Sequence, residues 1–185
     1  MIYQVGSAVL KPLTHLIYRP RVTGLANVPR DGGVIIASNH LSFIDSFAIP
    51  LVAPRQVSFL AKDDYFTGEG IVGQAKRAFF EGVGAIPVDR ESSRAAQESL
   101  DVALAALRAG KAFGIYPEGT RSRDGRLYRG RTGVAWLALT AGVPVVPVGL
   151  RGTENIQPVG ASFPRLAKVS VAFGPPIHPE SYTGM

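Results

Sequence analysis

The sequence predicts a single α/β domain in which a mostly parallel β-sheet is flanked by helices. Two observations carry this prediction. The chain has 185 residues, 46% of them hydrophobic and 18% charged, which suits one globular domain with a single core. Short apolar runs also alternate with segments of helical periodicity, as they do where helices connect parallel strands.

The first 18 residues predict an amphipathic helical segment in front of a domain that spans residues 19–185. Their apolar residues fall roughly on one helical face, and these are Ile2, Val5, Val9, Leu13, Leu16 and Ile17. Such a face either lies on a membrane surface or packs on the domain's own core, and the pattern fits both. Pro12 is expected to kink or end any helix here. Since the chain has no run of 18 or more apolar residues, no segment is expected to span a bilayer.

The first half of the domain begins with a buried strand. Its apolar run follows the turn pair Gly32-Gly33, which bounds a strand of this length. The next helix is closed by Pro54, because proline disfavours helical backbone in the residue before it. The elements expected in this half are a strand at 34–37, a helix at 45–52, a strand at 57–61, a helix at 69–80 and a strand at 85–88.

The clearest helix opens the second half and runs to Ala109. Ser92 or Ser93 caps its start, and Gly110 stops it. Between them lies an apolar stripe that consists of Ala96, Leu100, Ala103, Leu104 and Leu107. The elements expected after this helix are a strand at 112–116, a helix at 130–141, a strand at 143–150 and a strand at 169–173.

Composition excludes several kinds of chemistry. The chain has no cysteine, which rules out disulfides, thiolate metal sites and cysteine nucleophiles. Its three histidines are far apart and form no His-Glu-x-x-His pattern, so no metal site is expected. The net charge of +6 favours an anionic partner. The arginines form no dense basic run with interleaved aromatic residues, so nucleic-acid binding is not expected.

Two polar clusters each follow a predicted strand, and ligands bind beyond the carboxyl ends of the strands in open α/β sheets. The first cluster is Asn39-His40-Leu41-Ser42-Phe43-Ile44-Asp45. Asp45 can hold one ring nitrogen of His40 as N–H and leave the other free to accept a proton, as in a catalytic dyad. The alternative is a helix capping box formed by Ser42 and Asp45, and the two interpretations are compatible.

The second cluster is Tyr116-Pro117-Glu118-Gly119-Thr120-Arg121-Ser122-Arg123-Asp124-Gly125, and it combines residue types that bind anions. Glycine lets the backbone approach a ligand, threonine offers a hydroxyl, and arginine binds phosphate through two parallel hydrogen bonds. Five arginines crowd into this region, at positions 121, 123, 126, 129 and 131. Lys62 and Arg90 also end predicted strands. The alternatives are a polar surface turn for the cluster and plain solvated side chains for Lys62 and Arg90.

Together these segments resemble the glycerolipid acyltransferase family, and most closely its PlsC-type 1-acyl-sn-glycerol-3-phosphate acyltransferases. The resemblance covers about residues 20–175, with four motifs in the family's order. These are N-H-L-S-F-I-D at 39–45, G-A-I-P-V-D-R at 84–90, Y-P-E-G-T-R-S at 116–122 and V-P-V-V-P-V at 143–148. His-x4-Asp alone is unspecific, but it is a strong signal when P-E-G-T-R follows at this distance.

The resemblance implies an O-acyltransferase that acts at the free hydroxyl of 1-acyl-sn-glycerol-3-phosphate and gives phosphatidic acid for phospholipid biosynthesis. The acyl donor, a co-substrate, would be acyl-CoA or acyl carrier protein, with no cofactor and no metal. The implied protein is peripheral or monotopic at the cytoplasmic face of the cell membrane. Direct attack without an acyl-enzyme is expected, because a Gly-x-Ser-x-Gly motif is absent.

The resemblance also implies roles for individual residues. His40 matches the general base and Asp45 the carboxylate that orients it. The acceptor-binding motif is matched by Glu118, Gly119, Thr120 and Arg121. Arg121 and Arg90 are implied to bind the glycerol phosphate, and Lys62 the phosphate or the developing oxyanion.

Two other functions stay open from the sequence. The same dyad serves an enzyme whose acceptor is glycerol-3-phosphate, another lysophospholipid, a glycolipid or an N-acyl substrate. Asn39 beside the histidine, in place of a basic residue, favours lysophosphatidate over glycerol-3-phosphate. The basic charge and apolar N-terminus equally suit a membrane-binding module without catalysis. Acyl-chain length and oligomeric state do not follow from the residues.

Overall fold

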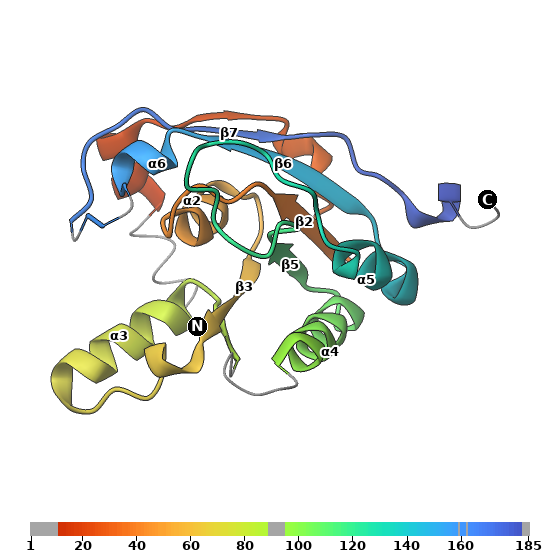
Figure 1. Ribbon diagram of the computed structural model, residues 1–185, viewed down its shortest axis with the longest axis horizontal. Coiled ribbons are helices and arrows are strands. Elements are labelled where there is room, and N and C mark those ends of the chain that lie inside the picture. The colour runs from red at the N-terminus through yellow and green to blue at the C-terminus, as the bar shows by residue number, and fades with distance from the viewer. Residues whose placement is uncertain (1–10, 89–94, 159, 162, 183–185) are drawn as a thin grey trace.

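A seven-stranded sheet forms the centre of the computed structural model, which describes residues 11–88, 95–158, 160–161 and 163–182. The strands are β1 (Arg21–Thr23), β2 (Val34–Ser38), β3 (Val57–Lys62), β4 (Ile86–Val88), β5 (Ala112–Ile115), β6 (Val145–Arg151) and β7 (Ser170–Phe173). They lie in the order β1-β7-β6-β2-β5-β3-β4. Every pairing between them is parallel except that of β6 with β7 (Figure 1). The predicted fold class is therefore confirmed.

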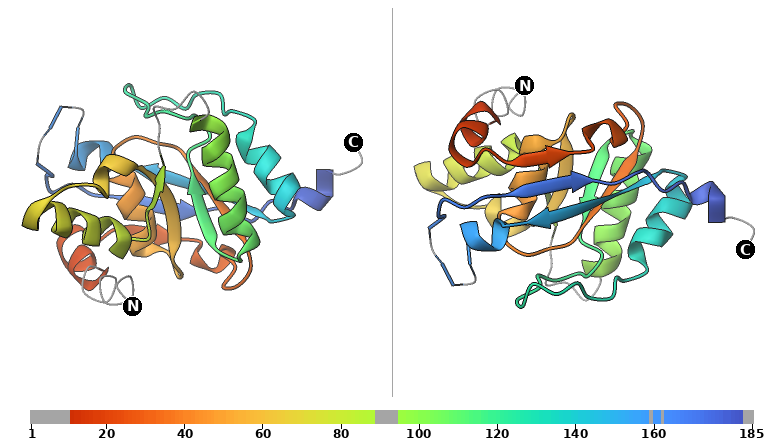
Figure 2. Two further views of the ribbon diagram at one scale, coloured as in Figure 1. Left: turned by 90° about the horizontal axis from the view of Figure 1, so that it is seen from below. Right: turned by 90° about the horizontal axis from the view of Figure 1, so that it is seen from above.

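Helices cover both faces of this sheet. The α-helices are α2 (Asp45–Val52), α3 (Gly70–Gly82), α4 (Ala95–Arg108), α5 (Gly133–Ala141) and the short α6 (Thr153–Ile156), and residues 11–18 are also helical. Three short 3-10 turns are η1 (Leu25–Asn27), η2 (Asp63–Tyr65) and η3 (Pro179–Tyr182). Helix α2 packs on one face, while α4 and α5 lie together on the other (Figure 2).

The central strand β2 shows why its sequence is a continuous apolar run. Val34 and Ile36 pack with α2, whereas Ile35 between them packs with α4 and α5, and all three are fully buried. A parallel strand covered on both faces needs apolar residues at every position. Each such side chain contributes about 1.5–3 kcal/mol of hydrophobic stabilisation, so this strand anchors the two layers.

Two short elements were not expected, and two expectations about element boundaries were wrong. The edge strand β1 and the helix α6 have no strong sequence signal, because three and four residues carry too little periodicity. The helix expected from residue 130 begins at Gly133, since the Arg131 amide donates to the Pro117 carbonyl at 2.8 Å. The helix near the N-terminus continues through Pro12 to Tyr18 and does not end at the proline.

The topology brings the two polar clusters to the same edge of the sheet. β2 and β5 are parallel neighbours, with Ala37 in register with Ile115. Their carboxyl ends therefore lie side by side, and the chain leaves each strand directly into one of the clusters. β3 runs parallel on the other side of β5 and ends at Lys62, at the same edge.

Candidate active site

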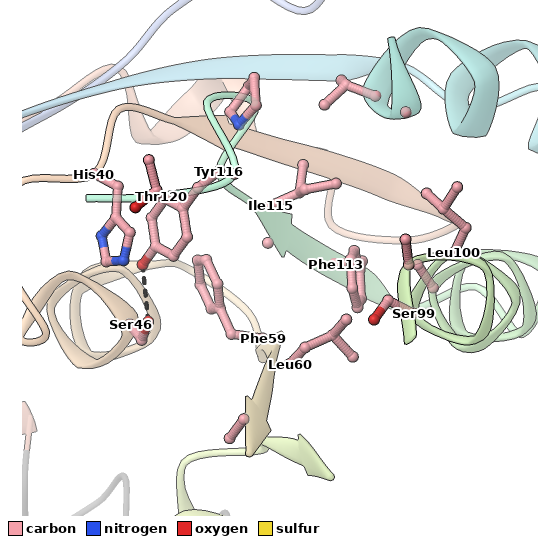
Figure 3. A pocket seen from close by; sticks show the side chains of 18 of the residues that line it. His40, Ser46, Phe59, Leu60, Ser99, Leu100, Phe113, Ile115, Tyr116 and Thr120 are labelled. Atoms are coloured by element: carbon pink, nitrogen blue, oxygen red, sulfur yellow. Dashed lines mark hydrogen bonds between the residues drawn. The ribbon is translucent and has the colours of Figure 1, made fainter. Parts of the chain in front are cut away.

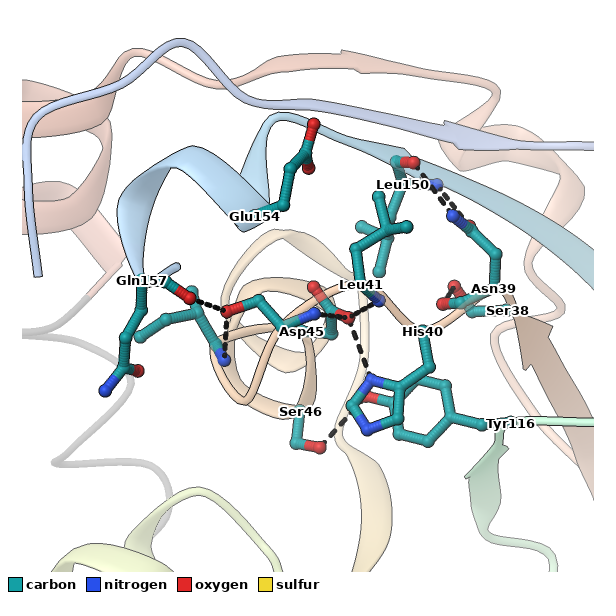
Figure 4. A network of polar contacts seen from close by, with 12 residues as sticks. Ser38, Asn39, His40, Leu41, Asp45, Ser46, Tyr116, Leu150, Glu154 and Gln157 are labelled. Carbon is teal, nitrogen blue, oxygen red and sulfur yellow. Dashed lines mark hydrogen bonds and ion pairs between the residues drawn. The ribbon is translucent and has the colours of Figure 1, made fainter. Parts of the chain in front are cut away.

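His40 lies in the loop that leaves β2, and Asp45 is the first residue of α2. Nδ1 of His40 lies 2.9 Å from Oδ2 of Asp45, and the other ring nitrogen points away from the carboxylate (Figure 4). A carboxylate only accepts hydrogen bonds, so Nδ1 carries the hydrogen and Nε2 is left as an acceptor. The His40 side chain is 15% exposed and that of Asp45 is fully buried. The pair has the geometry of a general base and its orienting carboxylate.

The backbone holds Asp45 in place independently of the histidine. Oδ2 also accepts the amide hydrogens of Leu41 at 2.6 Å and Ser42 at 2.8 Å. Hydrogen bonds to a charged acceptor are about twice as strong as neutral ones. The other oxygen, Oδ1, is buried and has no hydrogen-bond partner within the described part of the chain. The carboxylate of Asp45 is thus held in place through Oδ2, the same oxygen that contacts His40.

The capping-box interpretation holds in part. The Asp45 carboxylate reaches back to the Ser42 amide, as such a box requires. The Asp45 amide, however, donates to the Ser42 carbonyl at 3.2 Å, while the Ser42 hydroxyl donates to the Gln157 carbonyl at 3.0 Å. The N-cap residue of α2 is Ile44, which has no side-chain cap. Oδ2 of Asp45 therefore accepts hydrogen bonds both from the backbone just before α2 and from the imidazole of His40.

The face of the His40 imidazole rests on the ring of Tyr116, which follows β5. Their centroids are 3.7 Å apart and the ring planes differ by 7°. The Tyr116 hydroxyl makes a 2.9 Å hydrogen bond with that of Ser46 on α2 (Figure 3). Burial, and to a lesser degree the charge of Asp45, raises the pKa of Tyr116 well above its usual range. The phenol therefore stays protonated.

The loop over residues 116–131 is tied to the histidine by its backbone. The Ser122 amide donates to the His40 carbonyl at 2.7 Å, which joins the two polar clusters directly. Within the loop, Asp124 accepts hydrogen bonds from the hydroxyls of Ser122 at 3.1 Å and Tyr128 at 2.8 Å. Gly119 has a φ of 75°, a conformation that glycine adopts without strain. These hydrogen bonds hold the loop in place beside the imidazole.

A cleft of about 1010 Å³ opens at this edge of the sheet (Figure 3). The polar residues that line it beside the histidine are Lys62, Gly119, Thr120, Arg121 and Arg131. Its other part is mainly apolar, with Phe59, Leu60, Leu100, Phe113 and Ile115, and also includes the polar side chains of Gln97 and Ser99. A Cβ on Gly114 would lie 2.1 Å from the Phe59 ring, so the ring packs directly on this strand. The cleft suits a ligand with an anionic head and a long apolar tail.

The structure brings most of the predicted site residues together. His40, Lys62, Gly119, Thr120 and Arg121 line the cleft, and Asp45 supports the histidine from behind. Lys62 also pairs with Asp64, with Nζ 2.7 Å from Oδ2. Glu118 is buried and does not line the cleft, because its carboxylate accepts the Tyr128 amide hydrogen at 2.9 Å. Arg90 lies outside the described residues.

Sequence reasoning missed three contributors to the site. Tyr116 and Ser46 were not singled out, although Tyr116 opens the second cluster. Arg131 was counted among the crowded arginines, and the structure places its side chain against Gly119, where a Cβ would lie 2.9 Å from Nε. No three His, Cys, Asp or Glu side chains of the described residues come together to hold a metal ion.

Known proteins are similar in sequence to this chain over most of its length. Residues 19–151 match the family model described as Acyltransferase. The chain is 33% identical over 145 residues to the chloroplastic 1-acyl-sn-glycerol-3-phosphate acyltransferase of Brassica napus, covering 78% of this chain and 40% of that protein. It is 28% identical over 179 residues to the 1-acyl-sn-glycerol-3-phosphate acyltransferase of Bacillus subtilis, covering 96% of this chain and 83% of that protein. The chain thus spans less than half of the plant relative.

The same fold is present in a solved structure. The crystal structure of the 1-acyl-sn-glycerophosphate (LPA) acyltransferase PlsC from Thermotoga maritima matches with a TM-score of 0.78 at 24% sequence identity. The match covers 98% of this chain and 71% of that chain. At this identity the likeness concerns the fold, and it includes the sheet that positions His40.

Proposed function

Because the chain belongs to the acyltransferase family, we propose that it transfers a fatty acyl group from a thioester to the free hydroxyl of 1-acyl-sn-glycerol-3-phosphate, giving phosphatidic acid. The observation that carries this proposal is the His40–Asp45 pair opening into a cleft that is cationic at one end and apolar beyond. The acyl donor is acyl-CoA or acyl carrier protein, and the reaction needs no cofactor.

In the proposed reaction, Nε2 of His40 removes the proton of the acceptor hydroxyl while that oxygen attacks the thioester carbonyl carbon. The new C–O bond forms as the carbonyl π electrons move to its oxygen. When the tetrahedral intermediate collapses, the C–S bond breaks and the departing sulfur takes the proton from the imidazolium. The buried Asp45 stabilises that imidazolium. A positioned base of this kind contributes about 10²–10⁴-fold to the rate.

The cationic end of the cleft is proposed to bind the acceptor phosphate. Arg121 and Arg131 offer guanidinium groups that match phosphate geometry, and Thr120 adds a hydroxyl. Lys62 at the end of β3 is proposed to face the phosphate or the developing oxyanion. Glu118 supports this end indirectly, by holding the loop through Tyr128. Arg90 stays a prediction for the same phosphate.

A panel of acceptors tests the proposed function. Purified protein is incubated with palmitoyl-CoA or oleoyl-CoA and with lysophosphatidate, glycerol-3-phosphate or neutral lysophospholipids, and the lipid products are read by mass spectrometry. Phosphatidic acid formed from lysophosphatidate is the expected product. If only glycerol-3-phosphate is turned over, the proposed acceptor is wrong and the proposed acyl transfer stands. If no acceptor gives a product, the proposed acyltransferase activity is rejected.

Replacing Arg121 by alanine is expected to raise the KM for lysophosphatidate about tenfold or more, with a smaller effect on kcat. A charge-assisted hydrogen bond to phosphate contributes about 1.5–3 kcal/mol, and this contact is present in both ground and transition states. Arg30→Ala is the matched control, because Arg30 is exposed on the loop before β2, at the opposite edge of the sheet. An unchanged KM in the Arg121 variant argues against phosphate binding at this position.

The protein is further proposed to work at the cytoplasmic face of the membrane. No helix within the described ranges is long and apolar enough to cross a bilayer. Residues 11–18 and α3 lie toward the same end of the molecule (Figure 2) and line one pocket, and both present exposed apolar side chains. Leu16 is 69% exposed and Ile71 is 87% exposed. This surface supports shallow insertion among lipid headgroups.

Leu16→Asp is therefore expected to weaken binding to anionic vesicles several-fold, as measured by co-sedimentation, because it places a charge in the apolar contact. Leu139→Asp changes a comparably exposed leucine on α5, away from that surface, and is expected to leave vesicle binding unchanged. Equal binding by both variants would exclude residues 11–18 from the membrane contact.

A further inference from the structure

We propose that Tyr116 is a positioning residue that fixes the plane of the His40 imidazole, and that Ser46 fixes Tyr116 in turn. The inference rests on the proposed function in one respect, namely that His40 accepts a proton during turnover. Its structural basis is the parallel contact of the two rings described above.

The imidazole needs a second constraint because one hydrogen bond does not determine a plane. The hydrogen bond to Asp45 holds Nδ1 in place, but the imidazole ring can still rock about the line that joins Nδ1 to the Cβ of His40. Tyr116 removes this freedom, since a separation of 3.7 Å between parallel rings is close to van der Waals contact. Nε2 is consequently aimed in one direction into the cleft.

Tyr116 can impose this orientation because it is itself held on several sides. Its backbone continues directly from β5, and its ring also packs against Phe59 of β3, with centroids 5.2 Å apart. Its hydroxyl is bonded to Ser46, and burial keeps that hydroxyl protonated. Asp45 and Ser46 are consecutive residues of α2. The first turn of this helix therefore fixes the edge of the imidazole through one residue and its face through the next.

The stack also acts on the charge that develops during the reaction. When His40 takes the acceptor proton, the imidazolium lies over the π face of a tyrosine in a mostly buried setting, where a cation–π contact is favourable. This contact is stronger in the transition state than in the resting enzyme. Its loss should therefore lower kcat and leave substrate binding nearly unchanged.

The test compares three variants that remove different parts of the arrangement. Tyr116→Leu removes the ring, and kcat is expected to fall roughly 10²-fold, the effect of a small misplacement of a catalytic group. Tyr116→Phe and Ser46→Ala keep the ring and remove only its hydrogen-bonded anchor, so each is expected to lower kcat about fivefold, the effect of one hydrogen bond and well short of the loss of the ring. KM for both substrates should change little in all three. Tyr116→Met, whose unbranched side chain of similar volume adapts more easily to the vacated space, replaces the leucine variant if that one does not fold.

A buried ring elsewhere provides the control for packing. Phe173→Leu removes a buried aromatic side chain from β7, outside the cleft, and is expected to lower thermal stability while kcat stays near that of the unmodified protein. If Phe173→Leu lowers kcat as much as Tyr116→Leu, or if Tyr116→Leu retains kcat, the positioning role is rejected.

NMR of the histidine ring separates this inference from the proposed function, because it needs no turnover. In the unmodified protein and in Tyr116→Phe, the His40 ring protons are expected upfield, under the aromatic ring current, with the Nδ1–H tautomer dominant. In Tyr116→Leu the upfield shift is expected to disappear and the ring signals to broaden as the imidazole rocks, while the hydrogen bond to Asp45 keeps the Nδ1–H tautomer dominant. His40 resonances that do not move in Tyr116→Leu overturn the inference, even if no acceptor is turned over.

Discussion

Replacing His40 by alanine is expected to lower kcat for lysophosphatidate by a factor of about 10²–10⁴ while the protein stays folded. The side chain contributes one hydrogen bond and one ring contact, and it lies at the cleft surface and not in the core. Asp45 keeps the amide hydrogen bonds from Leu41 and Ser42 when the imidazole is removed. The expected loss is therefore catalytic.

The measurement is lysophosphatidate-dependent release of free CoA, alongside a thermal unfolding curve of the same preparation. His178→Ala is the matched control, because it removes an exposed histidine far along the chain. The vacated space between Asp45 and Tyr116 keeps its hydrogen-bond acceptor and its aromatic face, so added imidazole is expected to restore part of the activity. Full turnover by the His40 variant without imidazole would exclude His40 as the base.

The fold could be predicted for those strands and helices whose own burial sets the pattern of apolar residues in their sequence. The run at β2 is apolar at every position because both faces are covered, and the stripe on α4 repeats at helical spacing because one face is buried. β1 is different, since it exists only because β7 pairs with it. A three-residue edge strand is decided by that tertiary contact, which local periodicity does not contain.

The site was predictable to the same extent. The His40–Asp45 pair is local, five residues apart, so its spacing within the motif was informative. The stack of Tyr116 on His40 and its bond to Ser46, seventy residues away, depend on β2 and β5 being neighbours. Nothing in the spacing of these residues indicates either contact.

Asn39 illustrates a residue whose sequence interpretation lacked the structural context. Its position beside the histidine suggested a preference for one acceptor. The side chain instead pairs with the backbone of Leu150 on β6, accepting its amide hydrogen at 2.7 Å and donating to its carbonyl at 3.0 Å. This pairing secures the exit of β2, and therefore the position of His40. The acceptor preference stays a prediction with no contact between Asn39 and the cleft to support it.

Asp45→Asn is expected to abolish most activity with little loss of stability, whereas Asp45→Ala is expected to lose both. The amide oxygen of asparagine can still accept the hydrogen bonds of Leu41 and Ser42, so the start of α2 survives. It carries no charge to stabilise the imidazolium that forms during the reaction. The corresponding change in a Ser-His-Asp triad lowers kcat by about 10⁴. Alanine leaves two amides near the helix start without their acceptor, at about 1–3 kcal/mol for each that is buried.

Urea unfolding and kcat, measured on the same preparations, therefore distinguish the two roles of this carboxylate. If Asp45 only supported the start of the helix, activity would follow stability, and the asparagine variant would remain active. If it also orients and charge-balances His40, the asparagine variant is stable and inactive, a combination that a structural role does not produce. Because a single oxygen, Oδ2, makes the hydrogen bonds of this side chain within the described residues, asparagine removes the charge and keeps that acceptor, whereas alanine removes both.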